Sequence, residues 1–204
     1  MYLDPNIHTQ GDLVLTDDPS TLVVTRDEIK DHLRIDFNYE DDLLDMYIHS
    51  ATEMAENYCG RHFIEHEYKL YYSKIVREAS LVFPDCTLIT QTGQNDHHPV
   101  WWSIVGFTND FYSDDAYIYG KSNPSIVRLS SDFSDGGYPP SQYEGSLFWF
   151  HFKTGFGDAA SDVPQAIKQA IMLIVGDMYY FREDRKRSFP MASEILLQPY
   201  KCYH

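Results

Sequence analysis

The side chains that could carry chemistry in this chain are histidines and carboxylates, and their spacing matches no known catalytic or metal site. His97 and His98 lie beside Asp96 and could begin a metal site. Adjacent residues of a strand point to opposite faces, and Pro99 favours a loop, so a solvated loop explains this segment better. Adjacent aspartates could supply paired carboxylates for acid-base or metal chemistry. They stand at Asp17–Asp18, Asp41–Asp42 and Asp114–Asp115.

Nothing in the sequence brings these aspartate pairs together, and Asp41–Asp42 already has a role at the start of a predicted helix. The sequence Gly155-Phe156-Gly157 resembles the start of a phosphate loop but lacks the third glycine and the lysine. We therefore predict no catalytic residue, no cofactor and no metal ligand. The chain is expected not to be an enzyme, with a metal hydrolase as the competing hypothesis.

The three cysteines, Cys59, Cys86 and Cys202, are far apart in the sequence and include no CxxC pair. This argues against a disulfide framework and against a zinc site, and it fits a reducing cytoplasm. The N-terminus shows no basic region followed by an apolar one, and the longest aliphatic run, Ile171 to Val175, is short. We expect neither a signal peptide nor a membrane span.

The charge of the chain is strongly acidic, with 31 Asp and Glu against 16 Lys and Arg and a formal net charge of -15. Free DNA should be repelled, because binding to phosphates needs basic patches. The one dense basic run spans residues 182–187. Its cations are candidate contacts to DNA or to an acidic protein surface, or else they complement the end of a helix. They are Arg182, Arg185, Lys186 and Arg187.

Helical periodicity marks both ends of the chain. Thr25 and Glu28 form a capping box that starts a short helix through about Arg34. A longer helix follows the acidic cluster at residues 40–42 and stops at Gly60. Asp162 and Pro164 open a third helix, and a short fourth helix follows Pro190. The apolar stripes of these helices include Leu44, Ile48, Ile167, Ile171 and Ile174.

The middle of the chain reads as strands, because β-branched and aromatic clusters alternate there with turn residues. The predicted strands are 67–72, 80–83, 100–107, 116–119, 126–129 and 146–153. Trp101, Trp102 and Trp149 could form a sugar-binding platform, which would make this region a carbohydrate-binding or tail-associated β module. Packing in a sheet core or an oligomer interface is the commoner use of such residues.

The predicted fold class is α+β, with a helical core of three to four helices at residues 25–60 and 163–198 and an inserted β-rich domain. The expected domains are an extended N-terminal arm at 1–22, with a short strand at Leu13–Leu15, a helical core at 23–60 and 159–198, a β domain at 61–158 and a C-terminal tail at 199–204. Arms of this kind often become ordered only on a neighbouring molecule.

The two helical ends resemble the phage head-tail connector family, the head-completion adaptors. The N-terminal stretches that carry the resemblance are residues 25–36 and 55–63, and the C-terminal ones are 163–171, 179–183 and 195–200. Each is weakly specific alone, and together they occur in the expected order. This chain departs from the family pattern in its longer N-terminal arm and in its loop-rich insertion.

The resemblance implies a structural virion protein at the head-tail junction, assembled in the host cytoplasm. Its expected partners are further copies of itself in a ring, commonly a dodecamer, the portal protein, and the next tail or neck component. DNA would pass through the lumen without sequence-specific binding, and no membrane is involved. The candidate portal-binding residues lie in the C-terminal segment 195–204, treated as a tail beyond the main core: Leu196, Leu197, Tyr200 and Tyr203.

Overall fold

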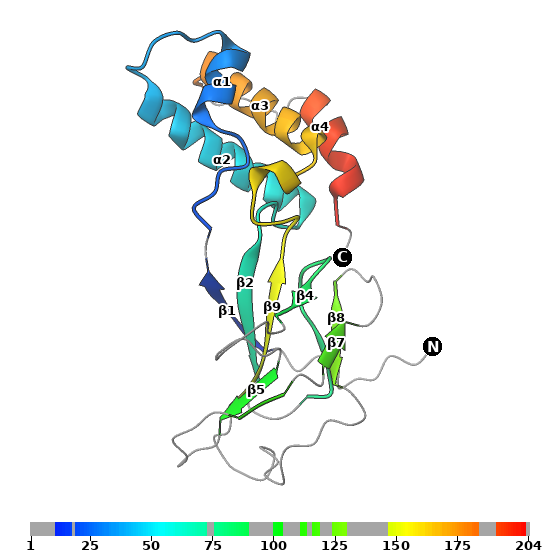
Figure 1. Ribbon diagram of the computed structural model, residues 1–204. Coiled ribbons are helices and arrows are strands. Elements are labelled where there is room, and N and C mark those ends of the chain that lie inside the picture. Colours follow the sequence, from blue (N-terminus) through cyan, green and yellow to red (C-terminus); the bar gives the residue numbers. More distant parts are fainter. Residues whose placement is uncertain are drawn as a thin grey trace. The chain divides into compact units, whose positions relative to one another are not determined.

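The computed structural model describes residues 11–17, 19–72, 76–89, 100–103, 111–113, 116–118, 124–129, 147–183 and 191–202. The chain forms two compact units, a helical one from residues 19–65 and 155–203 and a β unit from residues 1–18 and 66–154 (Figure 1). Its helices and antiparallel strands confirm the predicted α+β class.

The helical unit contains the α-helices α1 (Arg26–Leu33), α2 (Asp41–Cys59), α3 (Gln165–Tyr180) and α4 (Met191–Leu197), with the short 3-10 helices η2 (Ala160–Asp162) and η3 (Gln198–Tyr200). The predicted capping box is present: the Glu28 amide donates to the Thr25 hydroxyl at 3.3 Å, and the Thr25 amide donates to the Glu28 carboxylate at 2.7 Å. Gly60 ends α2 in the left-handed conformation that favours glycine, at φ 68.

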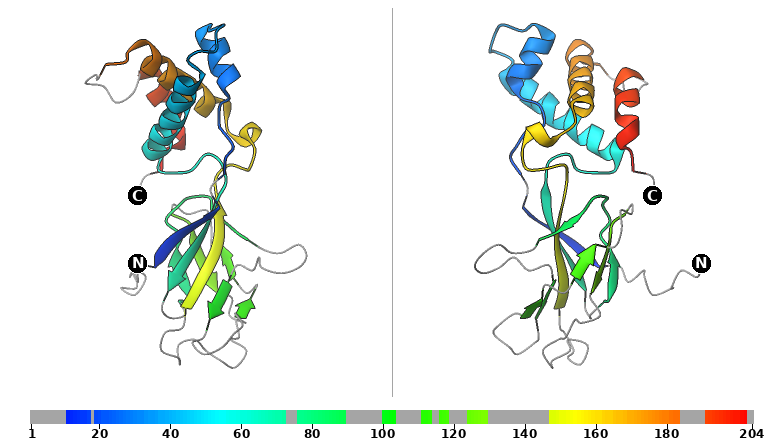
Figure 2. Two further views of the ribbon diagram at one scale, coloured as in Figure 1. Left: turned by 90° about the vertical axis from the view of Figure 1, so that its left-hand side faces the viewer. Right: turned by 45° about the vertical axis from the view of Figure 1, so that its right-hand side comes forward.

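One cluster of buried side chains holds this unit together. The two views in Figure 2 show α3 lying beside α4. The apolar stripes of α2 and α3 supply most of the cluster, and the residues predicted for it are each at most 2% exposed. They are Leu44, Ile48, Ile167, Ile171 and Ile174.

The described strands of the β unit form two antiparallel sheets. The larger has the strand order β1-β2-β9-β5-β6, with β4 also paired to β9, and the smaller has the order β3-β8-β7. The strands are β1 (Asp12–Asp17), β2 (His66–Tyr72), β3 (Glu78–Ser80), β4 (Thr87–Leu88), β5 (Val100–Ser103), β6 (Phe111–Ser113), β7 (Ala116–Ile118), β8 (Ile126–Leu129) and β9 (Leu147–Thr154).

The core of the β unit follows the two-residue period of β2 and β9. Tyr68, Leu70 and Tyr72 alternate with less buried residues along β2. They stand directly opposite Phe152, Phe150 and Phe148 of β9, all three of which are fully buried. Such cross-strand aromatic and aliphatic pairs stabilise a sheet face. The aromatic pattern of the sequence is therefore largely a core pattern on this pair of strands.

One predicted strand is wrong in its position. Residues 80–83 were expected to be extended, but β3 ends at Ser80 and the chain then turns, with Val82 at φ 73 and Asp85 at φ 49. The turn is held by Ser125, which accepts from the Leu81 amide and donates to the Phe83 carbonyl. Burial of Leu81 in the core of the β unit fixes this path and overrides the local β propensity.

Candidate interaction surfaces

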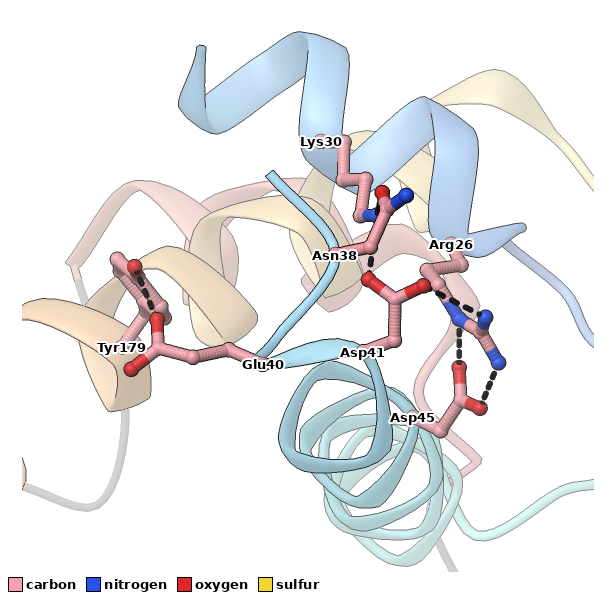
Figure 3. Close-up of polar contacts among 7 residues, drawn as sticks. All are labelled: Arg26, Lys30, Asn38, Glu40, Asp41, Asp45 and Tyr179. Carbon is pink, nitrogen blue, oxygen red and sulfur yellow. Dashed lines mark hydrogen bonds and ion pairs between the residues drawn. The ribbon is translucent and has the colours of Figure 1, made fainter. Parts of the chain in front are cut away.

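A polar cluster joins α1 to the first turn of α2 (Figure 3). The Arg26 guanidinium donates to Asp45 at 2.8 Å through Nε and to Asp41 at 3.1 Å. The Lys30 ammonium pairs with Asp41 and donates to the Asn38 side chain at 2.8 Å. The hydrogen bond from Lys30 lowers the pKa of Asp41, and the hydrogen bond from Arg26 lowers the pKa of Asp45. Both carboxylates are therefore held in their charged form.

A second set of contacts joins the start of α2 to the end of α3. The Glu40 carboxylate accepts a 2.6 Å hydrogen bond from the Tyr179 hydroxyl and a 2.9 Å hydrogen bond from Arg182. The bond from Tyr179 is the main cause that lowers the pKa of Glu40, and the same bond raises the pKa of Tyr179. Arg182 also lies over the Tyr179 ring, at 5.4 Å from its centroid.

Of the four cations that the sequence analysis singled out at residues 182–187, the structure describes one. Arg182 is engaged by Glu40 and its side chain is still 53% exposed, so it can also meet a partner. Arg185, Lys186 and Arg187 lie outside the described residues. Whether the four act together on DNA or on a portal stays a prediction.

Aromatic side chains gather at this end of the helical unit. Tyr39 is 80% exposed, Tyr180 65% and Phe181 54%, and Phe37 stacks on Tyr39 with ring centroids 4.1 Å apart. We call these four residues together with Arg182 the aromatic end. Exposed aromatic rings beside an arginine are the composition typical of binding hot spots. The sequence analysis missed Phe37 and Tyr39, because a short loop between two helices offers no periodicity to judge them by.

The C-terminal segment is docked on the helical core, and treating it as a tail beyond the main core was wrong. Leu197 is fully buried, and Leu196 and Tyr200 pack against the core cluster. The Tyr200 ring meets the Phe156 ring edge-on at 6.1 Å. The sequence pattern did not reveal this, because the segment is too short to show a stripe of its own. Tyr203 lies outside the described residues.

The N-terminal arm forms a strand where it is described. β1 pairs with β2 from Asp12 to Asp17, so the strand expected at Leu13–Leu15 is present and longer. Leu13, Val14 and Leu15 are between 36% and 45% exposed although they alternate between the two faces of the sheet. β1 is the edge of its sheet, and neither of its faces is covered by the described part of the chain.

The residues considered for catalysis do not form a site in the described part of the chain. Asp41 is paired with Lys30, Asp42 lies exposed in the first turn of α2, and Asp17 ends β1. The other candidates, Asp18, Asp96, His97, His98, Asp114 and Asp115, lie outside the described residues. Within the described ranges, no three His, Cys, Asp or Glu side chains are grouped so that they could hold a metal ion. No described helix is long and apolar enough to cross a membrane.

The tryptophans give a sugar platform little support. Trp149 is only 7% exposed, and its ring packs on Tyr71 at 5.3 Å between centroids. Trp101 and Trp102 lie in β5 and pair with β9, but their side chains are outside what the structure describes. A ring buried in this way cannot stack on a sugar, so Trp149 belongs to the packing of the sheet.

A family model described as Phage gp6-like head-tail connector protein matches residues 24–81, which hold α1, α2, β2 and β3. The resemblance to the head-tail connectors is confirmed. The connector match includes both N-terminal stretches that carried the resemblance, residues 25–36 and 55–63. It does not include the C-terminal stretches, whose connector character remains a prediction. No curated protein matches the chain at a significant level.

Solved structures match the fold of nearly the whole chain. A chain in the neck of an empty GTA particle, solved with C6 symmetry, matches with a TM-score of 0.69 and 17% identity over 95% of this chain and 96% of that one. A chain in the virion of a native gene transfer agent (GTA) particle gives 0.66 and 17% over 94% and 96%. One in the native GTA neck, solved with C12 symmetry, gives 0.56 and 18% over 94% and 96%.

Proposed function

We propose that this chain is a structural protein of a head-tail junction, one subunit of a connector ring that lies under a portal and extends its DNA channel. The observation that carries the proposal is the fold, which is shared over 95% of the chain with a protein of a GTA neck. The connector model, which matches residues 24–81, supports the same proposal. The work of such a protein is assembly, so no catalytic residue is needed. The chain would reside in the virion, at the junction.

A ring needs two different surfaces on each subunit, because contacts between neighbours are head-to-tail and must close. β1 is a good candidate for one of them. Its six residues include no lysine or proline that would protect a sheet edge, and its apolar side chains are exposed on both faces. A neighbouring subunit that covers β1 would remove this apolar surface from water. This would give the N-terminal arm a role in ring closure.

The portal contact is proposed for the outer surface of the C-terminal segment. Leu197 is fully buried, so it supports the segment from within and does not touch the portal. Leu196, Tyr200 and Tyr203 remain the proposed portal-binding residues, and Ile195, 63% exposed, joins them. The affinity of each subunit's contact can be modest. Once one subunit of a ring has bound a portal, the other subunits bind at a high effective concentration.

The acidic charge of the chain suits passage of DNA. A net charge of -15 gives a subunit that repels phosphates, so carboxylates facing a lumen would keep DNA from sticking during packaging and ejection. Arg182, Arg185, Lys186 and Arg187 are proposed to meet an acidic portal surface or the DNA backbone. No sequence-specific recognition of DNA is expected.

The portal contact is tested by co-sedimentation of the purified chain with portal rings. The variant Ile195→Glu/Tyr203→Ala should sediment with portal at a tenth of the wild-type amount or less, on the order of the effect of removing an interface hot spot. Met46→Glu is the matched control, because Met46 is 54% exposed on α2, and it should bind as wild type does. Both variants should keep the wild-type Tm. Wild-type binding by the double variant would move the portal contact away from the C-terminal segment.

A further inference from the structure

The fold brings together two cysteines of the helical unit that lie far apart in the sequence. Cys59 is the last residue of α2, and Cys202 follows η3 near the C-terminus. The Cys202 amide donates a 2.7 Å hydrogen bond to the Cys59 carbonyl, so the two backbones are in direct contact. A backbone contact of this kind brings two α-carbons into the range that a disulfide spans.

Both thiols are also turned toward the same short stretch of chain. The Cys59 thiol lies 3.9 Å from the Leu197 carbonyl oxygen, and the Cys202 thiol lies 3.8 Å from the Tyr200 carbonyl oxygen. These two carbonyls are the start and the end of one turn of 3-10 helix. The two thiols therefore contact carbonyl groups at the two ends of the same 3-10 turn.

The surroundings of the two sulfurs give them different roles. Cys59 is fully buried, and burial, followed by the nearby Cys202 thiol, raises the pKa of Cys59 to about 12. Cys59 is therefore protonated at neutral pH and is the slower of the two thiols to react. Cys202 is partly exposed, so a reagent in solution reaches Cys202 first.

We propose that Cys59 and Cys202 are a redox modification site that closes to a disulfide when the protein leaves a reducing cytoplasm. A low-molecular-weight disulfide such as oxidised glutathione is the oxidant. Cys202 attacks it and forms a mixed disulfide, releasing one glutathione thiol. Cys59 then attacks the sulfur of Cys202 and releases the second. The two protein thiols lose two protons and two electrons, and the oxidant becomes two thiols.

The bond would fasten the C-terminal segment to the end of α2. Lys201 over the Tyr58 ring at 4.3 Å, the Tyr200–Phe156 ring contact and the Cys202–Cys59 backbone hydrogen bond contribute to holding this point. A covalent link stops the segment from peeling away, and it stabilises mainly by limiting the unfolded chain, since it closes a long loop. The inference rests on this geometry alone and holds whatever the protein's function.

The test uses the full chain equilibrated with glutathione buffers of increasing oxidised fraction, then alkylated and analysed as peptides. Free thiols should fall from three to one, with Cys86 remaining and a peptide joining Cys59 to Cys202. Cys86, buried in the β unit, provides the control: Cys86→Ser should still lose two thiols. Cys202→Ser should keep both of its thiols and lose the rise in Tm that oxidation gives the wild type. Three remaining thiols, a mixed disulfide that stops at Cys202, or links only between chains would overturn the proposal.

Discussion

The Tyr179 hydroxyl donates a 2.6 Å hydrogen bond to the Glu40 carboxylate, and this bond ties the last turn of α3 to the start of α2. Arg182 binds the other oxygen of the same carboxylate. Glu40 thereby fixes the position of Tyr180, Phe181 and Arg182, three of the residues of the aromatic end. Glu40 thus links the two segments that carry the aromatic end, residues 37–39 and 180–182.

Replacing Tyr179 with phenylalanine should lower the Tm by a few degrees. The ring stays in place, but Glu40 loses its neutral hydrogen-bond donor and Arg182 must hold it alone. Tyr180→Phe is the matched control, because Tyr180 is the next residue and is 65% exposed, and it should melt as wild type does. Thermal unfolding followed by circular dichroism measures both. Equal Tm values for the two variants would show that the bond contributes nothing to stability.

The contribution of Asp45 to stability should depend on pH in a defined direction. Arg26 lowers the pKa of Asp45 in the folded protein below the ordinary value of 3.8. A lowered pKa means that the contribution is complete above pH 3.8 and is lost as the pH falls through the folded pKa. Asp45→Asn should therefore be less stable than wild type at pH 7, and the difference should shrink below about pH 4. Asp42→Asn, an exposed neighbour on the same turn, serves as the control. A difference between wild type and Asp45→Asn that stays constant from pH 7 to pH 3 would contradict this account of the Arg26–Asp45 pair.

Ile171→Asp should prevent folding of the helical unit. The side chain of Ile171 is fully buried in the core cluster, and an unpaired carboxylate there costs several kcal/mol, about the whole stability of a small domain. Gln169→Asp, two residues earlier on the exposed side of α3, should fold normally. A soluble Ile171→Asp variant with a cooperative melting transition would show that the helical core does not depend on this stripe.

The parts of the fold that local patterns control were predictable from the sequence. The Thr25–Glu28 capping box and the glycine at position 60 define helix ends through contacts within a few residues. The stripes of α2 and α3 gave the core, because a period of 3.6 residues places them on one face. β2 and β9 were predictable as strands for the same reason, because their buried side chains recur with a period of two residues.

The parts that long-range contacts control were not predictable. The pairing of β1 with β2 joins residues at least fifty positions apart in the sequence. It also requires Gly11, where a side chain would come within 2.8 Å of the Tyr71 carbonyl oxygen. The Tyr179–Glu40 bond and the contact of Cys59 with Cys202 also join distant residues. No spacing in the sequence links such pairs, so the aromatic end and the cysteine site emerged only from the structure.

The central claim is that this chain assembles as a ring on a portal, and electron microscopy of the purified chain mixed with portal rings tests it most directly. The account predicts class averages in which one face of the portal carries an added closed ring, with the rotational symmetry of a dodecamer and an open central channel. Bare portal rings beside unassembled monomers would contradict it, provided that both proteins are folded and the chain is in molar excess over portal subunits.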